Sequence, residues 1–224
     1  MKALIFDAGT LINFSMNSLL PLLANLKQIF NGKFLITEEV RYETIKRPLN
    51  IKKFKLGALR INELLRDKVI GLPSSLGIKD FEIQERARQL LRVSNRTFIA
   101  ENSYLHLIDK GEAACLVLSE ILTKKGVKNL IVIDERTTRM LCENPENLQK
   151  LLETKLHTTI RARKENFPIF KKFKIIRSTE LAYIAYKNGL VKLKNGNILD
   201  ALLYAIKFKG CSVSRNEIEE MKRM

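Results

Sequence analysis

The 224-residue sequence predicts an α/β fold, with three layers in which helices flank a central parallel sheet on both faces. Two short apolar runs, Ala-Leu-Ile-Phe at 3–6 and Leu-Ile-Val-Ile at 130–133, are followed at once by the carboxylates Asp7 and Asp134. Continuous apolar runs of this length are typical of strands buried on both faces. Helical patterns separate the two runs, and this alternation with short connections favours parallel pairing.

Apolar spacing, capping residues and helix breakers define the other elements. The expected elements are, in chain order, a helix at 14–30, a strand at 34–36, a helix from Thr37 to Ile45 that stops at Pro48, mostly helical structure at 50–98 with a break at 71–75, a helix at 112–124, and helices at 180–187, 198–208 and 214–223. Pro21 is compatible with the first of these helices only if it lies in the first turn. Gly126 ends the helix that precedes the second apolar strand. Ser214 and Glu217 form a capping box at the start of the last helix.

The segment 155–177 differs from the rest in composition. It carries eight Lys or Arg and one acid, Glu165, and its apolar pattern is weak. We interpret it as an insertion or loop. A single domain is expected over residues 1–224, with elaborations at about 50–98 and 155–177.

The net charge favours a polyanionic partner. The chain has 40 Lys and Arg against 24 Asp and Glu, which gives a formal charge of +16 at pH 7. Nucleic acid is the first candidate and an anionic membrane surface the second. The alternative is that the positive charge is simply solvated surface. The stretch from Phe14 to Phe30 is too polar to span a bilayer, so no membrane partner is expected.

Cysteine and histidine usage argues against disulfides and zinc. Cys115, Cys142 and Cys211 are odd in number, lie far apart and form no CxxC pair, as expected for buried thiols in a reducing compartment. His106 and His157 have no metal-ligand spacing. No signal peptide is visible, because the apolar start reaches an acid at position 7. A soluble, cytoplasmic protein is expected.

Carboxylates recur at positions that a parallel sheet brings together. Asp7 and Asp134 stand at strand tips, Glu43 lies within the helix after the second strand, and Glu112 opens a later helix. Oxygen ligands of this kind suit Mg²⁺ or Mn²⁺. An ion held there could activate water and stabilise charge on a phosphate. Glu135, next to Asp134, has two alternative interpretations: a secondary metal ligand, or an exposed acid in the first turn of the following helix.

Four motifs resemble those of one nuclease family. Asp7-Ala8-Gly9-Thr10-Leu11-Ile12 resembles the first motif of the PIN-domain nucleases. "TEEVRYETI" at 37–45, "DKGEAACLVLSEIL" at 109–122 and "LIVIDERTTRML" at 130–141 resemble the second, third and fourth. The segment 186–221 is also similar to the C-terminal helices of one subgroup. The resemblance covers residues 3–45, 105–142 and 186–221.

This resemblance implies an activity and a set of site residues. It implies a three-layer α/β fold and Mg²⁺- or Mn²⁺-dependent hydrolysis of phosphodiester bonds, usually in RNA. The acids that map onto the family motifs are Asp7, Glu43, Glu112 and Asp134, with Glu135 beside the last. Thr10 is expected at the same site as these acids, where its hydroxyl would orient water or substrate. Many members carry Asp where this chain has Glu112, and the middle segment and basic stretch have no counterpart.

Each acid also has a structural interpretation. Glu43 could pair with Arg47 on a solvated helix face, and Glu112 could be a first-turn acid that is favourable to the helix dipole. Asp109 is expected to cap the helix that follows it. A haloacid-dehalogenase-like phosphatase would need Asp-x-Asp-Gly-Thr, but here the chain is Asp7-Ala8-Gly9-Thr10, which lacks the second acid.

Two basic segments are candidate nucleic-acid surfaces. Residues 41–68 contain nine Lys or Arg with Phe54 among them, and residues 161–177 interleave basic residues with Phe167, Phe170 and Phe173. Basic and aromatic side chains together can contact phosphates and stack on unpaired bases, although these phenylalanines could equally belong to the core. The residues expected to contact RNA are Lys46, Arg47, Lys52, Lys53, Arg161, Arg163, Lys164, Lys171 and Lys172.

The protein is expected to be a metal-dependent ribonuclease that acts on single-stranded or unpaired RNA and cleaves within the strand, as an endoribonuclease does. Two alternatives stay open: a catalytically inactive RNA-binding or scaffold protein with the same fold, and the toxin component of a toxin–antitoxin pair. A homodimer, an antitoxin and an RNA-processing partner are all compatible with the sequence. RNA target, cleavage sequence and the number of metal ions do not follow from it.

Overall fold

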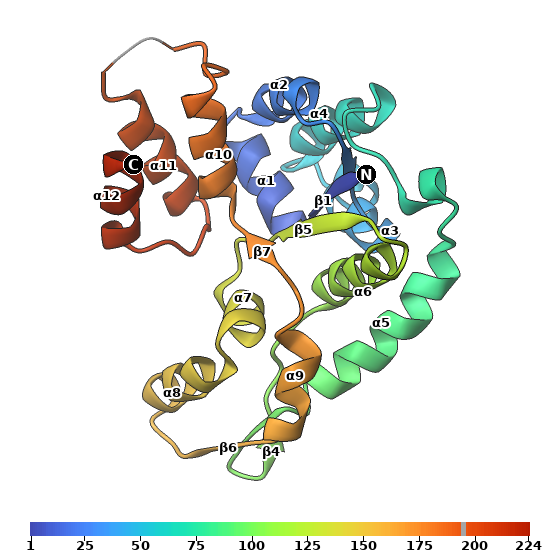
Figure 1. Ribbon diagram of the computed structural model, residues 1–224, viewed down its shortest axis with the longest axis vertical. Coiled ribbons are helices and arrows are strands. Elements are labelled where there is room, and N and C mark those ends of the chain that lie inside the picture. The colour runs from blue at the N-terminus through green and yellow to red at the C-terminus, as the bar shows by residue number, and fades with distance from the viewer. Residues whose placement is uncertain (194–195) are drawn as a thin grey trace.

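A four-stranded parallel sheet forms the centre of the fold. The computed structural model describes residues 1–193 and 196–224, and in it the strands lie in the order β2-β1-β5-β7. These strands are β1 (Lys2–Phe6), β2 (Lys33–Leu35), β5 (Lys128–Val132) and β7 (Ile175–Ile176). Helices lie on both sides of the sheet (Figure 1), which confirms the α/β class.

The chain turns into a helix directly after β1. Helix α1 (Ala8–Met16) begins one residue after Asp7, and α2 (Leu20–Ile29) follows a break at which Ser18 adopts a φ of 57°. The expectation of one helix at 14–30 is therefore wrong. The small residues after Asp7 accept a helical backbone because the Asp7 carboxylate caps it. Pro21 lies in the first turn of α2, where a proline is tolerated, and this helix starts at Leu20 and not at Phe14.

The next segment confirms its local signals. Thr37 Oγ1 accepts the Val40 amide at 3.3 Å and starts α3. The elements that follow are α3 (Glu38–Arg41), the π-helical turn η1 (Tyr42–Lys46), η2 (Pro48–Asn50), α4 (Lys55–Arg66), η3 (Pro73–Leu76) and α5 (Asp80–Ser94). Residues 50–98 are thus mostly helical, with an interruption close to the expected break.

The basic segment 155–177 is not a loop. It contains β6 (Ile160–Ala162), η4 (Lys164–Asn166), α9 (Phe167–Phe170) and the edge strand β7. Strand β6 pairs antiparallel with β3 (Phe98–Ala100), which also pairs with β4 (Ser103–Tyr104), so a second small sheet forms. Strands of two or three residues are too short to show an alternating pattern, so they could not be predicted from sequence.

Helices complete the two layers and the C-terminal part. They are α6 (Lys110–Lys124), α7 (Arg136–Glu143), α8 (Pro145–Leu156), α10 (Ser178–Lys187), α11 (Ile198–Phe208) and α12 (Arg215–Arg223). Helices α5 and α6 lie on one side of the sheet, and α1, α2 and α10 on the other (Figure 1). Helices α10–α12 share an apolar cluster of their own, and the capping box of Ser214 and Glu217 is confirmed. None of the helices in the described part of the chain has the length and apolar content needed to traverse a bilayer.

Candidate acidic site

The first acid stands where the sheet and α1 meet. Asp7 follows β1, its amide donates to the Val132 carbonyl at 3.1 Å, and its carboxylate is 6% exposed. Asp7 Oδ2 accepts the Gly9 amide at 3.0 Å and so caps α1. Burial raises the pKa of Asp7 to about 6, and the nearby charges of Asp134 and Glu135 act in the same direction. The amides of Gly9 and Ala8 at the start of α1 lower this pKa and partly offset the effect of burial.

The second acid comes from the π-helical turn η1. Glu43 is half-buried, and its carboxylate lies against the first turn of α6, where a Cβ at Gly111 would be 3.2 Å from each Oε atom. Burial raises the pKa of Glu43 to about 7, and the charges of Asp7 and Asp109 add to this. Single π turns inside helices occur frequently at functional sites.

The third acid opens α6. Glu112 is 9% exposed, and its Oε2 accepts the amide of Asp109, the N-cap residue, at 2.8 Å. Burial raises the pKa of Glu112 to about 8, and the negative charge of Asp7 is the second largest contribution in the same direction. The Thr138 hydroxyl is buried and lies close enough to the Glu112 carboxylate to lower this pKa.

Asp134 is held differently from the other acids. Its Oδ1 accepts the Ser178 amide at 2.8 Å, and its Oδ2 accepts the Ser178 hydroxyl at 2.7 Å and the Asn13 amide group at 3.2 Å. Asp134 is 3% exposed, so these neutral donors fix it in place. The sequence analysis missed Asn13 and Ser178, which lie far from Asp134 along the chain and follow no local motif.

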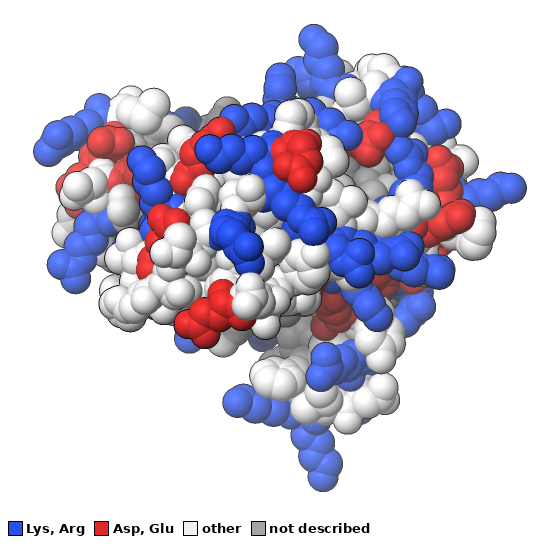
Figure 2. Space-filling view, turned by 90° about the horizontal axis from the view of Figure 1, so that it is seen from below, with Lys and Arg blue, Asp and Glu red and all other residues white. Residues whose placement is uncertain are grey.

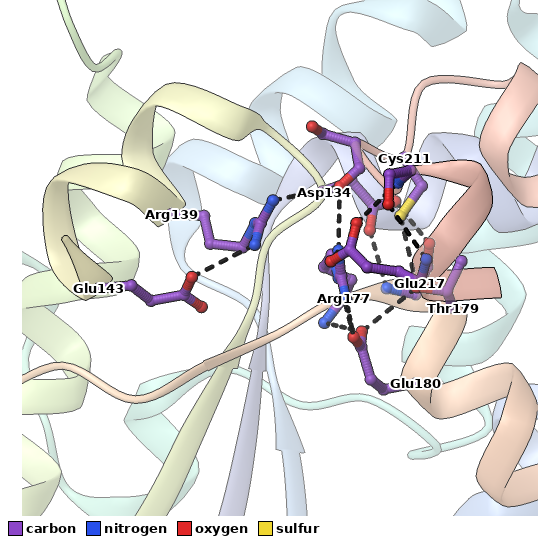
Figure 3. A network of polar contacts seen from close by, with 11 residues as sticks. Asp134, Arg139, Glu143, Arg177, Thr179, Glu180, Cys211 and Glu217 are labelled. Carbon is purple, nitrogen blue, oxygen red and sulfur yellow. Dashed lines mark hydrogen bonds and ion pairs between the residues drawn. The ribbon is translucent and has the colours of Figure 1, made fainter. Parts of the chain in front are cut away.

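A polar network behind Asp134 joins the sheet to the C-terminal helices (Figure 3). The Asp134 carbonyl accepts the Ser212 amide, and the Ser212 carbonyl accepts from both Arg139 and Arg177. The Arg177 side chain is 7% exposed and pairs with Glu180 and with Glu217, the latter at 2.6 Å. Asp134 is therefore a structural link as well as a candidate ligand.

Two remaining candidates differ in their placement. Glu135 is exposed, and its Oε2 accepts the Thr138 amide at 2.6 Å, so it caps α7. It also contributes to the raised pKa values of Asp7 and Glu112 and thus faces the site.

Thr10 is fully buried and donates its hydroxyl to the Val132 carbonyl at 3.2 Å. The expectation that Thr10 contacts water or substrate is therefore wrong: its hydroxyl joins α1 to β5.

The electrostatic centre of the site is Asp7. Its charge contributes to the raised pKa values of both Glu43 and Glu112, so two carboxylates from other segments are each repelled by Asp7 at this sheet edge. A divalent cation would relieve this repulsion, and carboxylate oxygens are the donors that Mg²⁺ and Mn²⁺ prefer. Over residues 1–193 and 196–224, no group of three or more His, Cys, Asp or Glu side chains is placed so that it could hold a metal ion, so the carboxylates would have to move closer together to bind one.

The expected RNA-contacting residues occupy more than one surface. Lys46, Arg47, Lys52 and Lys53 are exposed near Glu43, and Lys46 pairs with Glu38 at 3.2 Å. Arg161, Arg163 and Lys164 are exposed on or beside the small sheet, where Arg163 stacks over Tyr104 at 5.2 Å. Lys171 pairs with Glu146 on α8, at 3.0 Å.

Part of the basic segment lies away from the acids. Lys172 precedes β7 and lines a hollow with Lys2 and Lys128, at the edge where the parallel strands begin. The acids stand at the opposite edge, so Lys172 is misplaced for a role beside them. The three phenylalanines of this segment are core residues and cannot stack on bases: Phe167, Phe170 and Phe173 are 4%, 0% and 6% exposed.

Positive charge covers much of the surface. Figure 2 shows the lower face of the molecule, where Lys and Arg side chains outnumber Asp and Glu side chains.

In comparisons with known proteins, no family model, no curated protein and no solved structure matches this chain.

Proposed function

We propose that this chain is a Mg²⁺- or Mn²⁺-dependent ribonuclease whose reaction centre is the carboxylate group of Asp7, Glu43 and Glu112. One observation carries the proposal. Three partly or fully buried acids with raised pKa values converge on the ligand-binding edge of a parallel sheet, in a protein of net charge +16. Carboxylates kept together against their mutual repulsion serve a cation better than they serve the fold.

The chain's own residues would divide the work. Asp7, Glu43 and Glu112 would hold the ion, with Glu135 at the exposed rim and Asp134 fixed beside Asp7 by Asn13 and Ser178. Such an ion, when bound, supplies Lewis-acid activation of water and neutralises charge on a phosphate.

The surrounding lysines and arginines supply the attraction for the substrate. A phosphate backbone is drawn to basic side chains by long-range charge and displaces the counterions held there. Arg47 is exposed and near enough to lower the pKa of Glu43. A phosphate that contacts Arg47 would therefore also reach the carboxylates.

The test is cleavage of a labelled, mixed-sequence single-stranded RNA by the native protein with Mn²⁺, with EDTA, and by the Asp7→Asn variant with Mn²⁺. Cleavage by the native protein with Mn²⁺ alone would support both the activity and its site. Equal cleavage by the Asp7→Asn variant would overturn the assignment of the site. Salt-sensitive binding of several RNAs without any cleavage would favour the inactive RNA-binding alternative.

A further inference from the structure

A groove of about 640 Å³ lies between α1 and α4, directly beside the acidic site. Its lining comes from α1, from η1 and from the segment between Ile51 and the first half of α4. We call this hollow the α1–α4 groove. The lining residues used below are Ile12, Met16, Glu43, Arg47, Phe54 and Leu56.

The walls of the groove are apolar and exposed. Ile12 and Met16 stand four residues apart on one face of α1 and are 41% and 59% exposed. Phe54 and Leu56 also line the groove and are 50% and 61% exposed. Large apolar side chains that gather on one open surface mark a binding site more often than scattered ones do.

The rim of the groove is basic. Arg47, Lys53 and Arg60 line it, and Lys53 Nζ lies 5.3 Å from the centre of the Phe54 ring. Glu43 is the one acid among its lining residues. Apolar walls beneath a cationic rim fit a ligand that has both flat apolar parts and negative charge, which is the composition of an unpaired nucleotide.

The groove and the acidic site are continuous. Glu43 belongs to both, because its carboxylate is coupled to Asp7 and its side chain lines the groove. Helix α1 starts at the Asp7 cap, and Ile12 and Met16 lie on its following turns. A chain whose phosphate reaches Asp7 and Glu43 can therefore lay its adjacent bases along the groove.

We infer that the α1–α4 groove binds unpaired bases of the RNA strand next to the phosphate at the acidic site, with Phe54 as the stacking surface. The inference rests on the proposed function for the identity of the strand. It deepens that proposal because base faces are accessible only in a single strand, so the groove selects single-stranded over duplex RNA. Stacking of one base on an aromatic side chain changes affinity by about tenfold.

The test is binding of two short fluorescent single-stranded RNAs, one intact and one with a block of abasic residues. Every protein carries Asp7→Asn, and the buffer contains EDTA at fixed salt, so that binding is measured without cleavage. Phe54→Ala is compared with Phe81→Ala, a matched control on α5 that is 69% exposed and does not line the groove. Met16→Ser is a second groove variant, and thermal melts verify that each variant folds.

We expect Phe54→Ala to weaken binding of the intact RNA about tenfold and Phe81→Ala to leave it unchanged. The affinity of the abasic RNA for the Phe81→Ala protein should be as low as that of the intact RNA for the Phe54→Ala protein. Phe54→Ala and Phe81→Ala should bind the abasic RNA equally. Equal affinity of all the proteins for both RNAs would overturn the inference and leave a protein partner as the occupant. If the binding assay showed this dependence on Phe54 while the native protein with Mn²⁺ failed to cleave any RNA in the separate cleavage assay, the proposed nuclease would be refuted and the groove assignment would stand.

Discussion

The Glu43 carboxylate lies close to Gly111: a Cβ atom at position 111 would be 3.2 Å from each of the two Glu43 carboxylate oxygens. This contact links η1 to the first turn of α6 and places Glu43 beside the turn that carries Glu112. A glycine is needed here for close approach, and not for a special backbone conformation, because its φ is ordinary.

Gly111→Ala should therefore reduce activity without unfolding the protein. The added methyl would push the half-exposed Glu43 side chain aside and displace one of the proposed ligands. We expect a loss of Mn²⁺-dependent RNA cleavage of up to about tenfold, because the carboxylate has to shift by a few tenths of an ångström and a displacement of about 1 Å can cost about a hundredfold. The melting temperature should stay the same or rise, since alanine favours a helix more than glycine does.

Gly71→Ala is the matched control for that change. Its added Cβ would lie 3.7 Å from Ser75 Oγ, an ordinary contact, and Gly71 does not line the acidic site. We expect it to retain cleavage. Full activity in Gly111→Ala would mean that the position of Glu43 is irrelevant to the reaction.

The metal-free protein should lose stability as the pH rises from about 4.5 to 8. The pKa values of Asp7, Glu43 and Glu112 are raised to about 6, 7 and 8, so the folded state keeps protons that the unfolded chain has already released. Glu112→Gln removes one such cost and should raise the melting temperature in EDTA at pH 8 by about 3–6 °C, the equivalent of roughly one pKa unit.

Comparison at pH 4.5 provides the internal control for this effect. There Glu112 is protonated in the folded state, so Glu112→Gln should change the melting temperature little. An equal shift at both pH values would show that the variant acts through packing and not through the charge of the carboxylate.

Mn²⁺ should stabilise the native protein by an amount that grows with the logarithm of its concentration above the dissociation constant. At about 100 times the dissociation constant the gain is about 2.7 kcal/mol, which corresponds to an increase in melting temperature of about 5–10 °C. Glu112→Gln should remove most of this increase, whereas Glu165→Gln, at an exposed acid in the basic segment, should keep it. Equal stabilisation of both variants would argue against a metal at the acidic site.

Local signals in the sequence were sufficient where a short-range interaction fixes the backbone. Thr37 caps α3 through its own hydroxyl, Ser214 and Glu217 cap α12, and Gly126 adopts a φ of 71° after α6. The strand tips that carry Asp7 and Asp134 were predictable for the same reason, because a buried strand is a continuous apolar run.

Interactions across the fold could not be predicted in this way. Asn13 and Ser178 reach Asp134 over 121 and 44 residues of chain, so no spacing reveals them. Strands β6 and β7 are defined by their partners and not by their own patterns. The charge of the two basic stretches, 41–68 and 155–177, likewise did not reveal that Phe170 belongs to the core while Phe54 stays half exposed.

Asn substitutions at the two strand-tip acids should have opposite effects on stability. Asp7→Asn removes a buried charge whose pKa is raised, so it should stabilise the metal-free protein at pH 8. Asp134→Asn instead replaces an oxygen that accepts from Ser178 and Asn13 by an amide that donates, which leaves buried donors facing one another. Each unsatisfied buried group costs about 1–3 kcal/mol.

Urea unfolding at pH 8 in EDTA measures both effects. Ser178→Ala should also lower the free energy of unfolding, by about 1–2 kcal/mol, because one oxygen of Asp134 loses its hydroxyl donor. Thr154→Ala, which removes an exposed hydroxyl bonded within α8, is a control that should change stability little. If Asp134→Asn proved as stabilising as Asp7→Asn, Asp134 would belong to the repelling carboxylates and not to the link between β5 and α10.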